Sequence, residues 1–179
     1  MPYLSVANYL RGEETMRRRE LEFGILRDGP SPMWSHQETL LRLGSLLDAH
    51  VRAGALGKVC IAPIDVVLDR EKALIVQPDL VFVSTARLAI IDRRIWGAPD
   101  LAVEIMSPGS YRRDRSLKRR WYRQYGVREY WIVDPLAARI DLIDFEQPRS
   151  RRNQFTGAMP IVSRVLPGLS LTASMIVSD

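Results

Sequence analysis

The sequence predicts an α/β fold in which a mixed β-sheet is flanked by helices. The predicted elements follow the order helix, several strands, helix and two strands, rather than the regular strand–helix alternation of a parallel sheet. The segment 80–83 is apolar at every position, as is typical of a strand covered on both faces. The sequence has no glycine-rich phosphate loop, which argues against a nucleotide-binding fold.

The chain has 179 residues, which favours a single domain over 1–179 with a sizeable core. Its net charge of +5 favours a polyanionic partner such as nucleic acid, although many basic proteins bind none. No apolar run approaches the roughly 20 residues of a membrane span, and no signal-peptide pattern is present, so we expect a cytoplasmic protein without a membrane partner. Cys60 is the single cysteine, which excludes an intrachain disulfide and a thiolate metal cluster.

The N-terminal part is predicted to form an arm and then a long helix. Residues 1–19 are polar and arginine-rich, and they form an arm with a short amphipathic helix over 6–10. The long helix is predicted to begin at Ser35, which has Glu38 three residues later in the pattern of a capping box. Leucines follow at helical spacing, and Gly54 is a typical stop.

Strand patterns lie on both sides of this helix. A run of charged residues over 69–72 is typical of a hairpin turn, and 85–97 reads as a connector with one helical turn. The predicted strands cover residues 21–26, 59–68, 73–84, 101–106, 129–133, 139–145 and 160–165.

The strand over 101–106 carries an acid among apolar residues. Period-two alternation puts Glu104 on one face of this strand, together with Ala102 and Met106. A buried carboxylate is costly unless a cation satisfies it. Glu104 is therefore either part of a functional site or a salt-bridged glutamate at the edge of a sheet.

The second long helix is predicted over 113–125. Its apolar face contains Trp121 and Tyr125, and Asp114 and Lys118 lie inside or beside that face. This arrangement points the lysine toward the sheet that carries Glu104, unless Asp114 and Lys118 only pair with each other along the helix. The arginines occupy the opposite arc, at Arg112, Arg113, Arg115, Arg119, Arg120 and Arg123.

A further acid, Asp79, follows a proline within an apolar strand region, where the proline indicates an edge or a bulge. Asp79, Glu104 and Lys118 together indicate a divalent-metal site that acts on phosphate. The two histidines lack a second histidine at metal-ligand spacing, which argues against zinc. We interpret His36 as a surface or capping residue and His50 as a residue that complements the helix dipole.

A series of short motifs runs along nearly the whole chain. It consists of Glu20-Leu21 with Gly24, His36, Pro78-Asp79-Leu80-Val81-Phe82, Pro99-Asp100-Leu101-Ala102-Val103-Glu104-Ile105 with Ser107-Pro108, Asp114, Lys118, Tyr122, Gly126-Val127, Glu129-Tyr130-Trp131-Ile132-Val133-Asp134-Pro135 and Leu166-Pro167-Gly168-Leu169. This series closely resembles the restriction-endonuclease-like family within the PD-(D/E)XK nuclease superfamily. The block E-Y-W-I-V-D-P after a D-x-x-x-K helix is its most specific part.

The resemblance implies a restriction-endonuclease-like core and an endonuclease that hydrolyses DNA with Mg²⁺ or Mn²⁺. It implies that Asp79 and Glu104 bind the metal and that Glu20 is an additional acid of the site. The superfamily places a lysine two residues after the second acid, a position held here by Met106. Lys118 is the matching lysine, and its implied role is to orient the attacking water or to offset charge on the phosphate.

The same resemblance suggests how the substrate binds and leaves alternatives open. Arg115, Arg119 and Arg123 would contact backbone phosphates, unless they form an ordinary solvated face. A homodimer is expected by analogy, because enzymes that cut both strands usually dimerise. Met106, and Phe23 where the family usually has an acid, leave open the alternative of a cleavage-inactive protein that binds nucleic acid or a protein partner. A purely structural α/β domain is a third interpretation.

Overall fold

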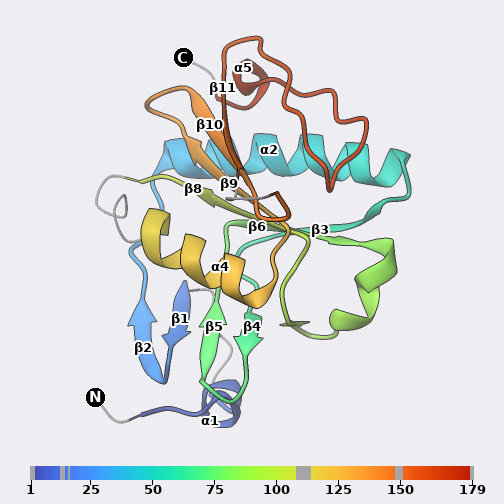
Figure 1. Cartoon of the computed structure of the whole chain (residues 1–179). Helices are drawn as coiled ribbons and strands as arrows, with labels where there is room; N and C mark the ends of the chain where they lie inside the picture. Colours follow the sequence, from blue (N-terminus) through green and yellow to red (C-terminus); the bar gives the residue numbers. More distant parts are fainter. Residues whose placement is uncertain (1–2, 13–14, 16, 108–113, 148–150, 178–179) are drawn as a thin grey trace.

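The computed structural model describes residues 3–12, 15, 17–107, 114–147 and 151–177, of which 114, 115 and 151 are described by their backbone alone (Figure 1). Two β-sheets and several helices make up this part of the chain. Within it, no helix combines the length and the apolar character needed to cross a membrane.

The larger sheet has six strands in the order β11-β10-β9-β8-β6-β3. β8 and β9 run parallel, and the other neighbouring strands run antiparallel, so the predicted mixed sheet is confirmed. The strands are β3 (Gly57–Ile61), β6 (Leu80–Ser84), β8 (Leu101–Ile105), β9 (Glu129–Asp134), β10 (Arg139–Asp144) and β11 (Arg151–Thr156).

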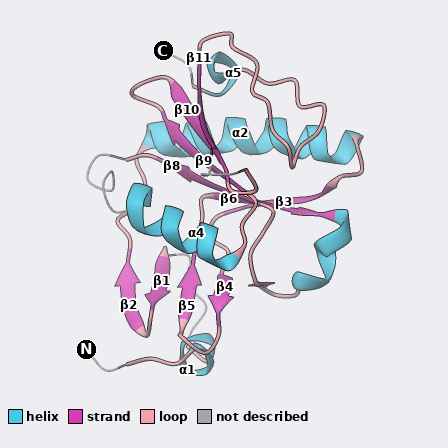
Figure 2. Cartoon of the chain, viewed as in Figure 1, coloured by secondary structure: helices cyan, strands magenta, loops and turns pink. Residues whose placement is uncertain are grey.

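Helices cover the two faces of this sheet (Figure 2). On one face lies α2 (Trp34–Ala53), whose buried leucines join a core with β8 residues such as Leu101 and Val103. On the other face lie the π-helical turn η2 (Asp114–Lys118) and α4 (Arg119–Tyr125), and Trp121 packs in a second core there. Both faces are therefore buried, which explains the apolar run over 80–83.

The smaller sheet lies at one end of the larger one, below α4 in Figure 1, and has the strand order β2-β1-β5-β4-β7. The short helix α1 (Val6–Leu10), predicted from the sequence, packs Val6 against Leu21 and Ile75 of this sheet. The remaining elements are β1 (Arg19–Glu22), β2 (Ile25–Asp28), β4 (Val66–Asp69), β5 (Leu74–Val76), β7 (Ile95–Trp96), the 3₁₀ helix η1 (Thr85–Ile90) and α5 (Ala173–Ile176).

Three predicted elements are wrong in detail. The strand predicted over 21–26 is a hairpin, because Phe23 and Gly24 adopt left-handed φ values of 49° and 81° between β1 and β2. The capping box at Ser35 does not form, since α2 begins at Trp34 with Met33 as its N-cap residue and without a side-chain cap. No strand forms over 160–165, and β11 pairs with β10 instead.

Two other predicted strands are each divided between the two sheets. The region 59–68 contributes to β3 in the larger sheet and β4 in the smaller one, and 73–84 contributes to β5 and β6. The hairpin turn over 69–72 is confirmed, with Asp69 accepting the N–H groups of Glu71 and Lys72. The chain therefore crosses from one sheet to the other between β5 and β6.

Candidate active site

Asp79 lies in the segment that joins the two sheets. This segment, 77–79, leaves β5 in the smaller sheet and enters β6 in the larger one. Asp79 is only 2% exposed, and its Oδ2 accepts the N–H of Ile105 at 2.6 Å. Because Ile105 directly follows Glu104 along β8, this hydrogen bond holds the two carboxylates next to each other.

Glu104 is buried in the middle of β8 and lies on the α4 side of the larger sheet. The alternation predicted for this strand is observed: Val103 and Ile105 belong to the core under α2, and Ala102 and Met106 to the core under α4. Oε1 of Glu104 accepts hydrogen bonds from Lys118 Nζ and Tyr122 Oη, each at 2.7 Å. Glu104 is thus a buried carboxylate with cationic partners, and not an acid at a sheet edge.

Lys118 ends the π-helical turn η2 and points inward, as the helical pattern predicted. Its side chain is 3% exposed, and Nζ lies 2.7 Å from Glu104 and 2.9 Å from Glu20. In α4, which follows the π-helical turn, Trp121 and Tyr122 are both buried. The side chain of Asp114, the alternative partner for this lysine, lies outside the described residues.

Glu20 reaches the same cluster from β1 of the smaller sheet. Its Oε1 accepts the N–H of Gln77 at 2.8 Å and forms the ion pair with Lys118. Phe23, at the turn that follows β1, packs edge-on against Trp121 of α4 with ring centroids 5.7 Å apart. The aromatic residue that replaces the family's acid therefore ties the hairpin of Glu20 to the helix that follows Lys118.

The structure brings together all four residues predicted to be catalytic, and it adds Arg18, which the sequence analysis assigned only to a polar arm. Arg18 Nη1 lies 3.0 Å from Asp79 Oδ1, and Nη2 lies 2.8 Å from Glu104 Oε2. Nη2 also donates to the carbonyl of Gln77 at 3.0 Å. One signal would have found it: Arg18 precedes Glu20 by two residues, and residues two apart in an extended chain share a face.

His36 is the second addition, and its interpretation as a surface or capping residue was wrong. It is 6% exposed, and its Nε2 lies 3.3 Å from Asp79 Oδ2. Its position was readable from the sequence, because His36 precedes the buried Leu40 by four residues and so lies on the same stripe of α2. His50, at the other end of α2, contacts the carbonyl oxygen of Pro167 at 3.1 Å.

The cations of the cluster favour the ionised forms of Asp79 and Glu20. Burial alone would raise the pKa of Asp79, but hydrogen bonding with His36 and the charge of Arg18 outweigh it and lower that pKa. The pKa of Glu20 is likewise lowered, because Lys118 and Arg18 outweigh its desolvation. Burial also opposes protonation of His36, but Asp79 outweighs this effect and raises the histidine's pKa. Burial and the nearby Glu104 carboxylate raise the pKa of Tyr122, which keeps its hydroxyl a donor.

The donor set fits a hard divalent cation. Asp79 Oδ1 and Glu104 Oε2 both lie within 3.0 Å of the Arg18 guanidinium, so these two oxygens already converge on one cationic group. Carboxylate oxygens are the ligands that Mg²⁺ and Mn²⁺ prefer, usually one or two carboxylates with water. Among the described residues, no group of three or more acids, histidines or cysteines is spaced to hold an ion. Two carboxylates are thus the protein ligands that this geometry offers, and the role of Glu20 as a further ligand stays a prediction.

The arginines predicted to bind DNA lie on the helix beside this cluster. Arg119 is partly buried and Arg123 is exposed on α4, while the side chain of Arg115 lies outside the described residues. Contact with phosphates therefore stays a prediction for all three.

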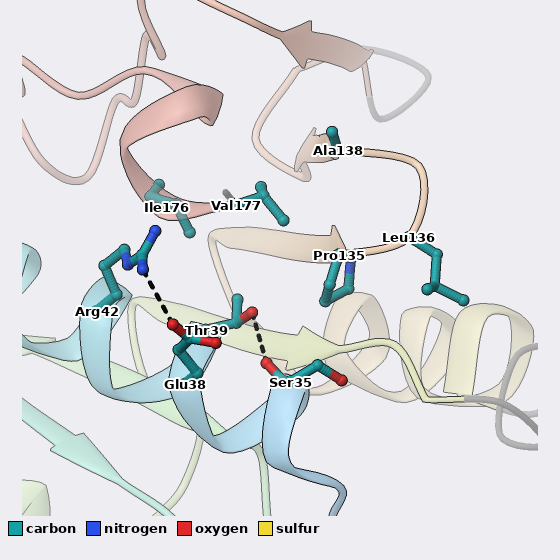
Figure 3. Close-up of a pocket in the computed structure, with 9 residues that line it drawn as sticks. All are labelled: Ser35, Glu38, Thr39, Arg42, Pro135, Leu136, Ala138, Ile176 and Val177. Carbon is teal, nitrogen blue, oxygen red and sulfur yellow. Dashed lines mark hydrogen bonds and ion pairs between the residues drawn. The ribbon is translucent and has the colours of Figure 1, made fainter. Parts of the chain in front are cut away.

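A separate hollow of about 300 Å³ lies beside the first turns of α2 (Figure 3). Its lining includes Ser35, Glu38 and Arg42 of α2, with Glu38 and Arg42 paired at 3.2 Å, and Ile176 of α5. None of the carboxylates around Arg18 lines this hollow. The hollow and the carboxylate cluster are thus distinct features of the molecule.

Comparisons with known proteins identify the fold and the family of the chain. The chain resembles a crystal structure described as a "putative nuclease belonging to DUF820" from Anabaena variabilis ATCC 29413. The two structures have a TM-score of 0.83 and 18% sequence identity over 98% of both chains, and this similarity shows the fold. No curated protein matches the chain significantly. The model of the Uma2 family, described as "Putative restriction endonuclease", matches residues 6–174. The predicted restriction-endonuclease-like fold is confirmed, and the chain belongs to the Uma2 family of restriction-endonuclease-like proteins.

Proposed function

We propose that this protein is a metal-dependent endonuclease that hydrolyses phosphodiester bonds of DNA. One observation carries the proposal: Asp79 and Glu104, from two neighbouring segments of the sheet, each direct an oxygen to the same cationic group while Lys118 holds the other oxygen of Glu104. A core that only needed to fold would have no reason to gather like charges at this cost.

The residues have distinct proposed roles. Asp79 and Glu104 bind Mg²⁺ or Mn²⁺, and Glu20 supports the site from β1 by holding Lys118 in place. A bound ion of this kind activates water and offsets the charge that develops on the phosphate. Lys118 orients the attacking water or stabilises the phosphate, and Tyr122 fixes the orientation of the Glu104 carboxylate through its hydroxyl.

The surrounding surface supports a nucleic-acid substrate. The chain carries a net charge of +5, and Arg119 and Arg123 lie on α4, the helix that continues from Lys118. We propose that these arginines, together with Arg115, contact the phosphate backbone. We also propose that residues 1–179 act as one domain and that two copies pair to cut both strands, a state that sedimentation would reveal.

One observation favours a second function. Met106 occupies the position where the superfamily has its lysine, and it is packed in the core under α4. If Lys118 did not replace that lysine in catalysis, the protein would bind nucleic acid or a protein partner without cutting.

A plasmid-nicking assay tests the proposal. Supercoiled plasmid is incubated with the wild type in Mg²⁺ or Mn²⁺, beside Asp79→Ala, Lys118→Ala and the control Lys58→Ala on the exposed surface of β3. We expect nicking by the wild type and the control, and its loss in the two site variants. DNA retarded in a gel without nicking in either metal would contradict cleavage and support the binding function.

A further inference from the structure

Arg18 stands in the position that a divalent ion would need. Its two terminal nitrogens lie 3.0 Å and 2.8 Å from Asp79 Oδ1 and Glu104 Oε2, one oxygen of each proposed metal ligand. The remaining oxygens have other partners: the N–H of Ile105 lies on Asp79 Oδ2, and Lys118 and Tyr122 lie on Glu104 Oε1. An ion that reached both carboxylates would therefore meet the guanidinium first.

The charge balance of the cluster also favours an ion that replaces Arg18 over an ion that is added beside it. Glu20, Asp79 and Glu104 contribute three negative charges, and Arg18 and Lys118 contribute two positive ones, which leaves a net charge of −1 with His36 neutral. A divalent ion added to this set would leave a net charge of +1 in a buried site. A divalent ion that replaces Arg18 would make the cluster neutral, which is the less costly arrangement at low dielectric.

The two cations differ in how easily they can leave. The Lys118 side chain is 3% exposed and lies beneath α4, whereas the Arg18 side chain is 27% exposed. Arg18 lies just before β1, and its carbonyl oxygen accepts the N–H of Gly29 at 2.9 Å, so its backbone is held while its side chain reaches the surface. A long arginine side chain at such a position can swing its charged end into water while Lys118 stays with Glu20 and Glu104.

We propose that Arg18 is a built-in competitor of the divalent ion: its guanidinium neutralises Asp79 and Glu104 in the metal-free protein and must leave both carboxylates before the ion binds. The inference rests on the proposed metal site and adds its regulation. Arg18 acts on metal affinity and on the stability of the metal-free protein in opposite directions, a combination that neither a metal-supporting nor a purely structural residue would give.

Equilibrium binding of Mn²⁺, followed through the electron paramagnetic resonance signal of the free ion and without nucleic acid, tests this competition. The variants are Arg18→Gln, which removes the charge, and Arg18→Lys, which keeps the charge but loses the planar fork through which the guanidinium donates from two separate nitrogens. The matched control is Arg19→Gln, because the neighbouring Arg19 pairs with Asp28 at the edge of the smaller sheet. Urea unfolding in EDTA gives the stability of each metal-free protein.

We expect Arg18→Gln to bind Mn²⁺ more tightly than the wild type by about 5- to 100-fold, the range usual for coupled sites. Arg18→Lys should lie between them, and Arg19→Gln should match the wild type. In EDTA the order should reverse, with the lowest urea midpoint for Arg18→Gln, because its carboxylates lose their partner.

Mn²⁺ affinity that is unchanged or weaker in both Arg18 variants would overturn the competition. If the wild type still nicks plasmid in Mn²⁺, that result would leave the proposed function standing. If neither the wild type nor an Arg18 variant binds Mn²⁺, both the competition and the metal-dependent function are overturned.

Discussion

Two buried carboxylates four residues apart, Asp100 and Glu104, have different surroundings. Asp100, just before the strand, is 0% exposed and accepts the N–H of Ser84 at 2.7 Å. Its Oδ1 lies 3.4 Å from Arg87 and 3.2 Å from Arg128. Asp100 thus pairs with two arginines. Arg128 also pairs with Glu146, so this group contains two acids and two arginines and its charges cancel.

Glu104, four residues later on the same face of the strand, lies among other acids. Asp79 and Glu20 join it, and the three carboxylates share Arg18 and Lys118. The comparison teaches that burial of an acid does not by itself mark a functional site. We propose that an excess of carboxylates over arginines and lysines does, because like charges held together raise the affinity for a further cation at the expense of stability.

The largest expected effect is a difference in the free energy of unfolding between variants of Asp100 and Glu104. Asp100→Asn should lower the free energy of unfolding by about 1–3 kcal/mol, because it removes the charge that satisfies buried donors. Glu104→Gln should lower it by less, since it relieves repulsion in a cluster with excess negative charge. Urea unfolding in EDTA measures both, and a greater loss in Glu104→Gln would break the comparison.

The pH dependence of stability sharpens the comparison, because His36 belongs to the cluster of Glu104. Asp79 raises the pKa of His36 above its ordinary value of 6.5, so the protonated form is favoured by folding. Its contribution is therefore fully present below pH 6.5 and is lost as the pH rises through the raised pKa.

The wild type in EDTA should thus exceed His36→Gln by about 1–2 kcal/mol in acidic buffer, and by progressively less toward alkaline pH. Unfolding at a series of pH values measures this difference. The control is His50→Gln, which removes a histidine at the other end of α2, outside the cluster. A difference that grows with rising pH would contradict the role given to Asp79.

The smallest effect concerns arginines outside both clusters. Arg119→Ala and Arg123→Ala should each weaken DNA binding a few-fold and reduce the slope of log affinity against log salt by about 0.9 for each phosphate that the variant no longer neutralises. Fluorescence anisotropy of a labelled duplex in EDTA measures both quantities. Arg52→Ala is the control, because Arg52 pairs with Asp48 in the last turns of α2. Equal slopes for all variants would assign Arg119 and Arg123 to a solvated surface.

Much of the fold was predictable because the spacing of apolar residues along the sequence indicates helices and strands. The leucine spacing of α2 and the alternation of β8 reflect elements that bury one stripe or face against a core, and both predictions are confirmed. β11 has the polar sequence RRNQFT and forms through its pairing with β10, so no local pattern marks it. Phe23 and Gly24 form a turn that an apolar run conceals.

Local sequence patterns also indicate only part of the site. Asp79, Glu104 and Lys118 were predicted because acids and a lysine are unusual among apolar residues, and Glu20 was predicted from the family resemblance alone. Arg18 and His36 were missed, because an arginine in a polar arm and a histidine near a helix start look like surface residues until tertiary contacts place them beside Asp79. The strand-like spacing of Arg18 and Glu20, and the helical spacing of His36 and Leu40, were the available signals.

Mn²⁺ binding by Glu104→Gln and Asp100→Asn, compared in one titration with the wild type, would decide whether the cluster around Glu104 is a metal site. We expect one saturable ion per chain in the wild type and in Asp100→Asn, and its loss in Glu104→Gln, because Glu104 is a proposed ligand and Asp100 is already balanced by two arginines. Mn²⁺ bound as tightly by Glu104→Gln as by the wild type would contradict this expectation.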